Sequence, residues 1–145
     1  METILESEKD FGAVSRSQAD ADLANPGYQA FTILRLGFTV APIIAGADKF
    51  LHLLVNWNQY LPPIVKNTFG ESASTLMLAV GVIEIVAGIG VLIKPKIFAY
   101  VVAAWLVVII ANLLLIPGYF DVALRDLGLA LGALALGRLS SIYDN

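Results

Sequence analysis

The stretch LMLAVGVIEIVAGIGVLI, from Leu76 to Ile93, is the segment around which the rest of the chain is expected to assemble. Its eighteen residues include one charged side chain, Glu84, close to the centre. A run of that length and apolarity is typical of a helix that spans a membrane. A carboxyl group at the middle of a bilayer costs roughly 2.5–3.5 kcal/mol on insertion scales. Glu84 is therefore expected to face protein or water and to have a partner.

The helix face around Glu84 has the composition of a close helix–helix contact. At helical spacing, Gly81, Glu84 and Gly88 lie on the same face. Glycines at such positions let the backbone of a neighbouring helix approach closely. We therefore expect a contact built around a carboxyl group, with the other side supplied by a second helix of this chain.

The composition is typical of a polytopic membrane protein. The 145 residues suit one domain, and 58% of them are hydrophobic while 14% are charged. The mean hydropathy of +0.78 is outside the soluble range. The net charge of −3 argues against a nucleic-acid partner, because phosphate binding needs clustered Lys and Arg.

The residue inventory also limits the chemistry. The chain has no cysteine, which excludes disulfides, iron–sulfur clusters and thiolate metal sites. His52 is the single histidine, so this chain cannot build a multi-histidine metal site. We expect no metal site, no intrinsic cofactor and no catalytic motif, which leaves an enzymatic role open but not favoured.

The predicted fold is all-α, a polytopic four-transmembrane-helix bundle formed by residues 28–140. The apolar runs place its helices at about 28–54, 75–93, 97–116 and 119–139, before a short tail at 141–145. Residues 55–74 are too polar to span. Trp57, Tyr60 and Phe69 alternate there with polar residues and are expected to anchor an amphipathic interfacial segment, with a plain loop as the alternative.

Residues 1–27 form a polar, acidic N-terminal tail without the apolar region of a secretory signal peptide. Two interpretations stay open. One is a solvated, partly disordered tail, in which ESEKD starts a short helix. The other is an arm that docks a partner subunit, with Phe11 and Val14 as anchors.

Four spans place both termini on the same side of the membrane, and the positive charges indicate which side. Five lysines and arginines lie on the terminal side and two on the other: Lys9, Arg16, Lys94, Lys96 and Arg138 against Lys49 and Lys66. Because cytoplasmic loops carry the excess of Lys and Arg, both termini are expected in the cytoplasm of a bacterium, with the bundle in its inner membrane.

Nine polar residues are expected to form an intramembrane network: Arg35, Asp48, Lys49, His52, Glu84, Asn112, Asp121, Arg125 and Asp126. At about 1.5 Å of rise per residue, Glu84 lies about 15 Å from the cytoplasmic boundary. Arg35 and Arg125 approach it from opposite sides, so either is expected to pair with it. The near balance of charges suggests a paired network and not an ion pore.

The network has three possible roles. It fixes the packing and register of the bundle, or it binds a quinone head group or a proton from the outer leaflet, or, less favoured, it lines an ion or solute pathway. Small residues expected at helix contacts are Gly46, Gly81, Gly88, Gly128 and Gly132.

Three stretches together resemble the DoxX family of small four-helix membrane proteins. ILRLGFTVAPIIAGADKFL is similar to the first helix of the family, with an internal arginine and a Gly-x-x-Lys ending at Lys49. LAVGVIEIVAGIGVLI resembles the second helix, in which a glycine follows the acid by four residues. DVALRDLGLALGALAL is similar to the last helix, with its acid–arginine start. The resemblance covers about residues 28 to 140.

The resemblance implies a four-helix bundle and an association with membrane oxidoreductases. Two functions follow from it as hypotheses. The first is a non-catalytic accessory subunit of a larger membrane electron-transfer complex. The second is a quinone-binding subunit, as in a thiosulfate:quinone oxidoreductase-like enzyme. In either case the expected contacts are the lipid bilayer and other membrane subunits, and a quinone or lipid is the only cofactor considered.

Overall fold

The computed structural model describes residues 2–144, which fold into α-helices and one short 3-10 helix, with no strand among them. The all-α prediction is confirmed. The helices are α1 (Glu2–Ala24), α2 (Pro26–Leu51), η1 (Trp57–Tyr60), α3 (Pro63–Phe69), α4 (Ser72–Ile93), α5 (Pro95–Leu114) and α6 (Phe120–Tyr143).

Three helices, α2, α4 and α5, are long and apolar enough to cross a membrane. This agrees with a membrane protein. The fourth helix of the predicted bundle, α6, is not one of the three. It carries four charged residues along its 24-residue length, which are Asp121, Arg125, Asp126 and Arg138. The structure thus supports three of the four expected spans by composition.

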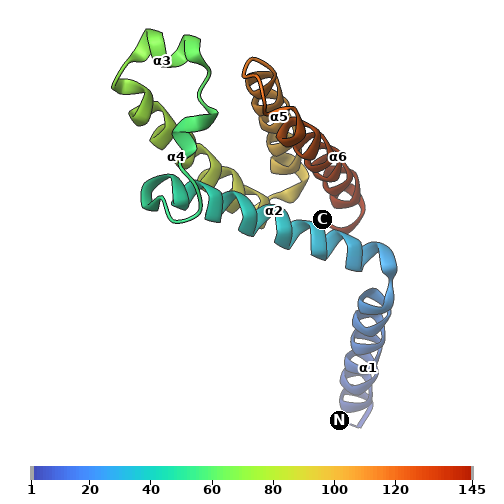
Figure 1. The fold of residues 1–145 in the computed structure, drawn as a ribbon. Coiled ribbons are helices and arrows are strands. Elements are labelled where there is room, and N and C mark those ends of the chain that lie inside the picture. The colour runs from blue at the N-terminus through green and yellow to red at the C-terminus, as the bar shows by residue number, and fades with distance from the viewer. Residues whose placement is uncertain (1, 145) are drawn as a thin grey trace.

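The four helices of the bundle form two pairs, α2 with α4 and α5 with α6. Figure 1 shows that the pairs meet at one end and diverge toward the other. We call the first the terminal end, since it contains the start of α2, the α4–α5 turn and the end of α6. The other, with η1, α3 and the α5–α6 turn, is the loop end.

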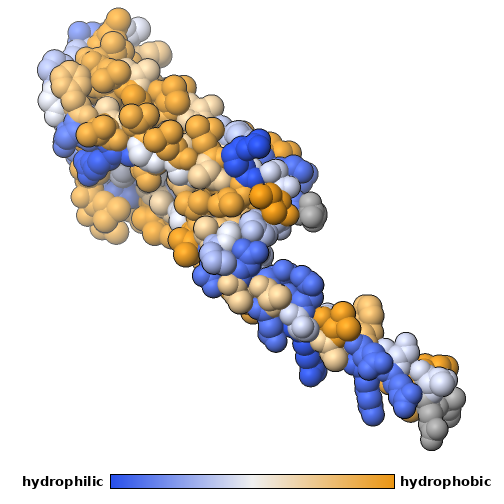
Figure 2. All heavy atoms as spheres, turned by 90° about the vertical axis from the view of Figure 1, so that its right-hand side faces the viewer, coloured by the Kyte–Doolittle hydropathy of each residue, from blue (hydrophilic) through white to orange (hydrophobic). Residues whose placement is uncertain are grey.

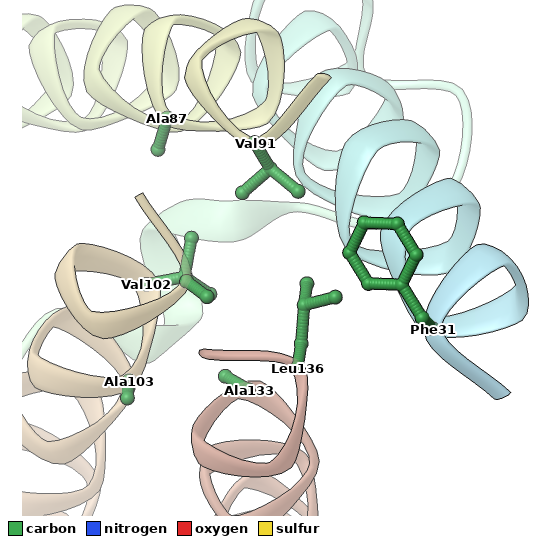
Figure 3. Packing of buried hydrophobic residues seen from close by; sticks show 8 residues of the cluster. Phe31, Ala87, Val91, Val102, Ala103, Ala133 and Leu136 are labelled. Carbon is green, nitrogen blue, oxygen red and sulfur yellow. The ribbon is translucent and has the colours of Figure 1, made fainter. Parts of the chain in front are cut away.

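The main core lies at the terminal end, where all four long helices converge (Figure 3). It is built largely of small side chains, and Val91, Ala99, Ala133 and Leu136 are fully inaccessible. Alanines let helix backbones approach closely, which suits a bundle whose outer surface is itself apolar. This core fixes the position of α6 beside the candidate spans.

The segment that joins the first two long helices is folded and packs on the loop end. After η1, Leu61 is buried with Ala73 and Met77 of α4, and the Trp57 ring packs against this small cluster. The segment is therefore two short helices and not a plain loop. Its depth in a bilayer stays a prediction.

The outer surface of the bundle is mostly apolar. Figure 2 shows a nearly continuous hydrophobic surface over the bundle and a largely hydrophilic surface over α1. Large side chains of the candidate spans, among them Ile33, Ile83 and Val107, are about half exposed or more. Apolar area of this extent on a monomer marks contact with lipid or with other proteins.

The N-terminal region is helical over its whole described length, whereas the sequence predicted at most a short helix there. Residues Glu2–Ala24 form α1, and only Gly12 interrupts a run of residues that tolerate helix well. Nearly every side chain of α1 that the structure describes is exposed. The sequence of residues 1–27 did not predict a helix of this length, because its apolar residues are too sparse to show a helical periodicity.

The ends of the helices differ by a few residues from the boundaries predicted from the sequence. Asn25 caps α2, accepting from the Gly27 backbone N–H at 2.8 Å, and this helix ends where His52 adopts a left-handed conformation with φ of 54°. Helix α4 begins earlier than expected, at Ser72. Glu71 is its cap and makes no side-chain capping bond.

Candidate functional site

Helices α2 and α4 touch backbone to backbone at two glycines. A side chain on Gly46 would overlap the Gly81 carbonyl oxygen, and one on Gly81 would lie 2.8 Å from the Gly46 carbonyl oxygen. A third glycine, Gly88, faces α2 about two turns after Gly81. A Cβ on Gly88 would meet the Thr39 carbonyl oxygen at 2.7 Å. The face that carries Glu84 is thus the face of α4 that packs on α2.

Glu84 pairs with Lys49 across this contact. The Lys49 ammonium donates to Glu84 Oε2 at 2.5 Å. Lys49 is 2% exposed and Glu84 9%, so the pair is buried. The expectation that Glu84 pairs with Arg35 or Arg125 is wrong, because neither guanidinium is among its bonded partners within residues 2–144.

The directions of the side chains explain the pairing. Helices α2 and α4 run antiparallel, with Gly46 beside Gly81 and Thr39 beside Gly88. Side chains on a helix lean toward its N-terminus, so Lys49 and Glu84 lean toward each other from opposite sides of the glycine contact. The Lys49 stem passes over Gly81, where a Cβ would lie 3.1 Å from Lys49 Cβ. Gly81 thereby makes the room that the lysine needs.

The chain that follows α2 folds back over the pair. The Lys49 ammonium lies 3.8 Å from the centroid of the Trp57 ring. The Trp57 indole N–H donates to Asp48 Oδ2 at 2.7 Å, and the other oxygen of Asp48 accepts from the Leu53 and Leu54 N–H groups at 2.8 and 3.0 Å. Asp48, 4% exposed, therefore holds the tryptophan as a lid over the ammonium.

Arg35 has a different role from the one expected. Its guanidinium donates to the carbonyl oxygen of Leu92, in the last turn of α4. Carbonyls at the end of a helix lack intrahelical partners, and a cation there also complements the helix dipole. Its Nε is buried and has no hydrogen-bond partner in the described part of the chain. Arg35 thus ties α2 to the end of α4 at the terminal end.

Arg125 is also placed away from Glu84. It forms a 4.0 Å ion pair with Asp121, one turn earlier in α6, and both side chains are more than 70% exposed. An exposed pair of this kind contributes little stability in water. The prediction failed because depth along a helix does not fix the face on which a residue lies.

Helices α5 and α6 each place one further polar side chain partly inside the bundle, Trp105 and Asp126 respectively. The Trp105 indole N–H has no hydrogen-bond partner among residues 2–144. No sequence pattern singled out Trp105, since a tryptophan in an apolar run is typical of a lipid-facing residue.

Asn112 connects α5 to η1 at the loop end. Its side-chain amide donates to the Tyr60 carbonyl oxygen at 2.9 Å, and the Tyr60 ring lies edge-on to Tyr119 at 5.1 Å. Trp57 and Tyr60 are half-buried in these contacts, whereas the Phe69 side chain is 50% exposed. The first two of the three expected anchors therefore pack within the protein.

A small pocket opens beside the pair at the loop end. It has a volume of about 120 Å³, and its walls are Lys49, His52, Asn58, Ser74, Met77 and Leu78. A more open hollow of about 380 Å³ adjoins it at His52 and Asn58 and includes Asn56. Arg125 lines neither of them. The described residues hold no group of three or more His, Asp or Glu side chains placed to bind a metal.

The expected glycine pair of α6 divides. A Cβ on Gly132 would lie 3.3 Å from the Phe38 ring of α2, so this glycine lies at a helix contact. Gly128 has open space at the corresponding position and is exposed. The prediction that Gly128 packs against a helix is wrong.

The site as a whole is a buried ion pair, Lys49 with Glu84, that joins α2 to α4. It is reinforced by the Trp57 ring, and the small pocket and the adjoining hollow lie at its edge. Comparisons of the chain with protein-family models, with curated proteins and with solved structures find no match.

Proposed function

We propose that this protein is a DoxX-like, non-catalytic accessory subunit of a larger membrane electron-transfer or oxidoreductase complex. The observation that supports this most is the Lys49–Glu84 pair. Its 2.5 Å contact is buried and covered, so the strongest polar groups inside the bundle are bonded to one another. Such a pair specifies one arrangement of two helices.

The pair also leaves little for chemistry. The ammonium of Lys49 has three N–H groups, which face Glu84, the Ala45 carbonyl oxygen at 3.5 Å and the Trp57 ring. The pocket beside it is well below the roughly 300–1,000 Å³ of small-molecule sites. A rigid, paired interior suits a subunit that supports others better than one that turns over a substrate.

The exterior favours an assembly. The candidate spans expose apolar side chains on several faces, and α1 extends from the bundle without packing along it (Figure 1). Lipid accounts for the surfaces of the spans. It does not account for a 23-residue polar helix outside them.

We include α6 as the fourth span in this proposal. It pairs with the candidate span α5 and contributes Ala133 and Leu136 to the core shared by all four helices. A helix that packs along a spanning helix lies at the same depth. Its Arg125 and Asp121 are close to the loop end, where long side chains can extend to the interface.

The location proposed is the inner membrane of a bacterium, with both termini in the cytoplasm. The excess of Lys and Arg at the terminal end supports this orientation. A reporter that is active only in the cytoplasm, fused after the C-terminus, is expected to give signal, whereas the same reporter inserted at Gly70 is not. The opposite pattern of signals contradicts the orientation.

The test of the accessory role is purification in a mild detergent from the native organism. We expect the protein to co-migrate with stoichiometric membrane subunits that carry a redox centre, and deletion of its gene to lower the amount of that complex. Isolation as a free chain, with no co-migrating subunit at any detergent concentration that keeps it folded, argues against this role.

A second candidate is a quinone-binding subunit. The pocket favours it, because Lys49, His52, Asn58 and Ser74 offer polar atoms while Met77 and Leu78 offer an apolar wall. A quinone ring requires the pocket to join the adjoining hollow. The test is quenching of tryptophan fluorescence by a water-soluble short-chain quinone. Quenching that is lost in Ser74→Leu and kept in Arg125→Leu supports this candidate. Equal quenching in the unaltered protein and in both variants argues against it.

A further inference from the structure

Among the long helices of residues 2–144, α1 alone packs along no other helix. It contacts only the start of α2 to any extent. Its large apolar side chains are exposed: Ile4 by 65%, Leu5 by 51%, Phe11 by 78%, Val14 by 68% and Leu23 by 62%. Figure 2 shows separate apolar patches on an otherwise hydrophilic arm.

The junction between α1 and α2 is held by side-chain contacts and is not a free linker. The Gln29 side chain donates to the Leu23 carbonyl oxygen at 2.9 Å and so satisfies the end of α1, while Asn25 caps the start of α2. The Tyr143 hydroxyl, from the end of α6, reaches Asn25 Oδ1 at 3.3 Å. A side chain on Gly27 would overlap that hydroxyl. Contacts from both ends of the chain thus hold the direction of the arm.

An isolated helix of this composition needs external support. Helices in proteins derive most of their stability from packing of an apolar face. Within the described part of α1 no ion pair forms, and the one side-chain bond inside it joins Gln18 to Asp22 at 3.2 Å. The apolar residues Ile4, Phe11 and Val14 nevertheless follow a spacing of seven and three, which places them on one side of the helix.

The net charge of α1 indicates what kind of surface covers its apolar stripe, which is formed by Ile4, Phe11 and Val14. Residues 3–24 contain five acidic and two basic side chains. Anionic lipid head groups repel such a helix, which has the opposite charge from the basic helices that lie on membranes. A second copy of α1 carries the same net charge and also repels it. A protein groove rimmed by Lys and Arg is complementary.

Building on the accessory role proposed above, we infer that α1 is a pre-oriented docking helix that inserts the Ile4–Phe11–Val14 stripe into an apolar, basic-rimmed groove of a partner subunit. Phe11 is the expected anchor because aromatic side chains carry a large share of interface energy. The fixed junction lowers the ordering cost of binding.

The test is photocrosslinking in intact cells, with a benzophenone amino acid at Phe11 and, as a matched control, at Ala13 on the opposite face. We expect Phe11 to crosslink to one protein, at a segment flanked by Lys or Arg residues, and Ala13 to give at least about tenfold less product. In the full-length protein, Phe11→Asp is expected to lower the amount of co-purified partner at least about tenfold. Thermal unfolding of the bundle stays unchanged, since α1 lies outside it.

The other outcomes overturn the inference in distinguishable ways. Crosslinks from Phe11 to lipid, to a second copy of this chain or to an acidic segment reject the basic groove. A complex that survives Phe11→Asp intact rejects the docking helix and leaves the accessory role standing. Failure of the unaltered protein to co-purify with any subunit rejects both.

Discussion

Replacing Lys49 with methionine is expected to destabilise the protein by about 3–5 kcal/mol, the usual cost of removing one partner of a buried ion pair. Methionine keeps most of the apolar stem that passes over Gly81, so the loss is mainly that of the charge. The Glu84 carboxylate then stays 9% exposed, without its 2.5 Å partner. Thermal unfolding of purified protein in detergent measures the effect.

A double-mutant cycle separates the pairing from the packing. Glu84→Gln removes the buried charge, so Lys49→Met is expected to cost much less in that background. Arg125→Met is the matched control, because it removes a cation whose side chain is 71% exposed, and it is expected to change stability by less than about 0.5 kcal/mol. If Lys49→Met and Glu84→Gln add within about 0.5 kcal/mol, the two side chains are not coupled in solution.

The sequence predicted the elements of the bundle well because those signals are local. Apolar runs of sufficient length define α2, α4 and α5, and the spacing of Gly81, Glu84 and Gly88 defines the face of α4 that meets a neighbour. Both properties can be read from one segment without knowledge of the others.

The partner of Glu84 could not be predicted in the same way. Depth estimates placed both arginines within reach, but they omit which face each side chain occupies and how far it leans along its helix. Pairing across a contact depends on the register of two helices, which Gly46 and Gly81 set by their backbone approach.

The N-terminal helix shows a different limit. A helix that packs on its own protein carries a regular apolar face, and α1 does not have one of sufficient density. Its stripe has Ser7 and Gln18 at positions where a buried helix has apolar residues. Sequence patterns of this kind leave both a free tail and a docking arm open, and the contacts of Gln29 and Tyr143 at the junction are what favour the arm.

The glycine contact and the ion pair stabilise the same interface by different means. Backbone approach at Gly46 and Gly81 brings Lys49 and Glu84 within bonding distance, and the pair in turn excludes other registers of α2 on α4. If the accessory role holds, this is the part of the molecule that keeps the surface for its partners in one shape.

Gly46→Ala is expected to destabilise the protein by about 1–3 kcal/mol, the usual cost of overpacking. The added methyl overlaps the Gly81 carbonyl oxygen and lies close to the Ile85 side chain. A backbone atom cannot rotate away as a side chain can, so α2 and α4 must separate. That separation also lengthens the Lys49–Glu84 contact, and the two losses are expected to be coupled.

Gly128→Ala is the matched substitution with the opposite expected sign. Nothing lies within 4 Å of its Cβ position, so the variant gains helix propensity of about 0.5–1 kcal/mol without a clash. Both variants change one hydrogen to a methyl on a long helix, and thermal unfolding in the same detergent compares them directly. Stabilisation by both contradicts the backbone contact at Gly46, because the propensity gain of alanine then acts there without the opposing clash.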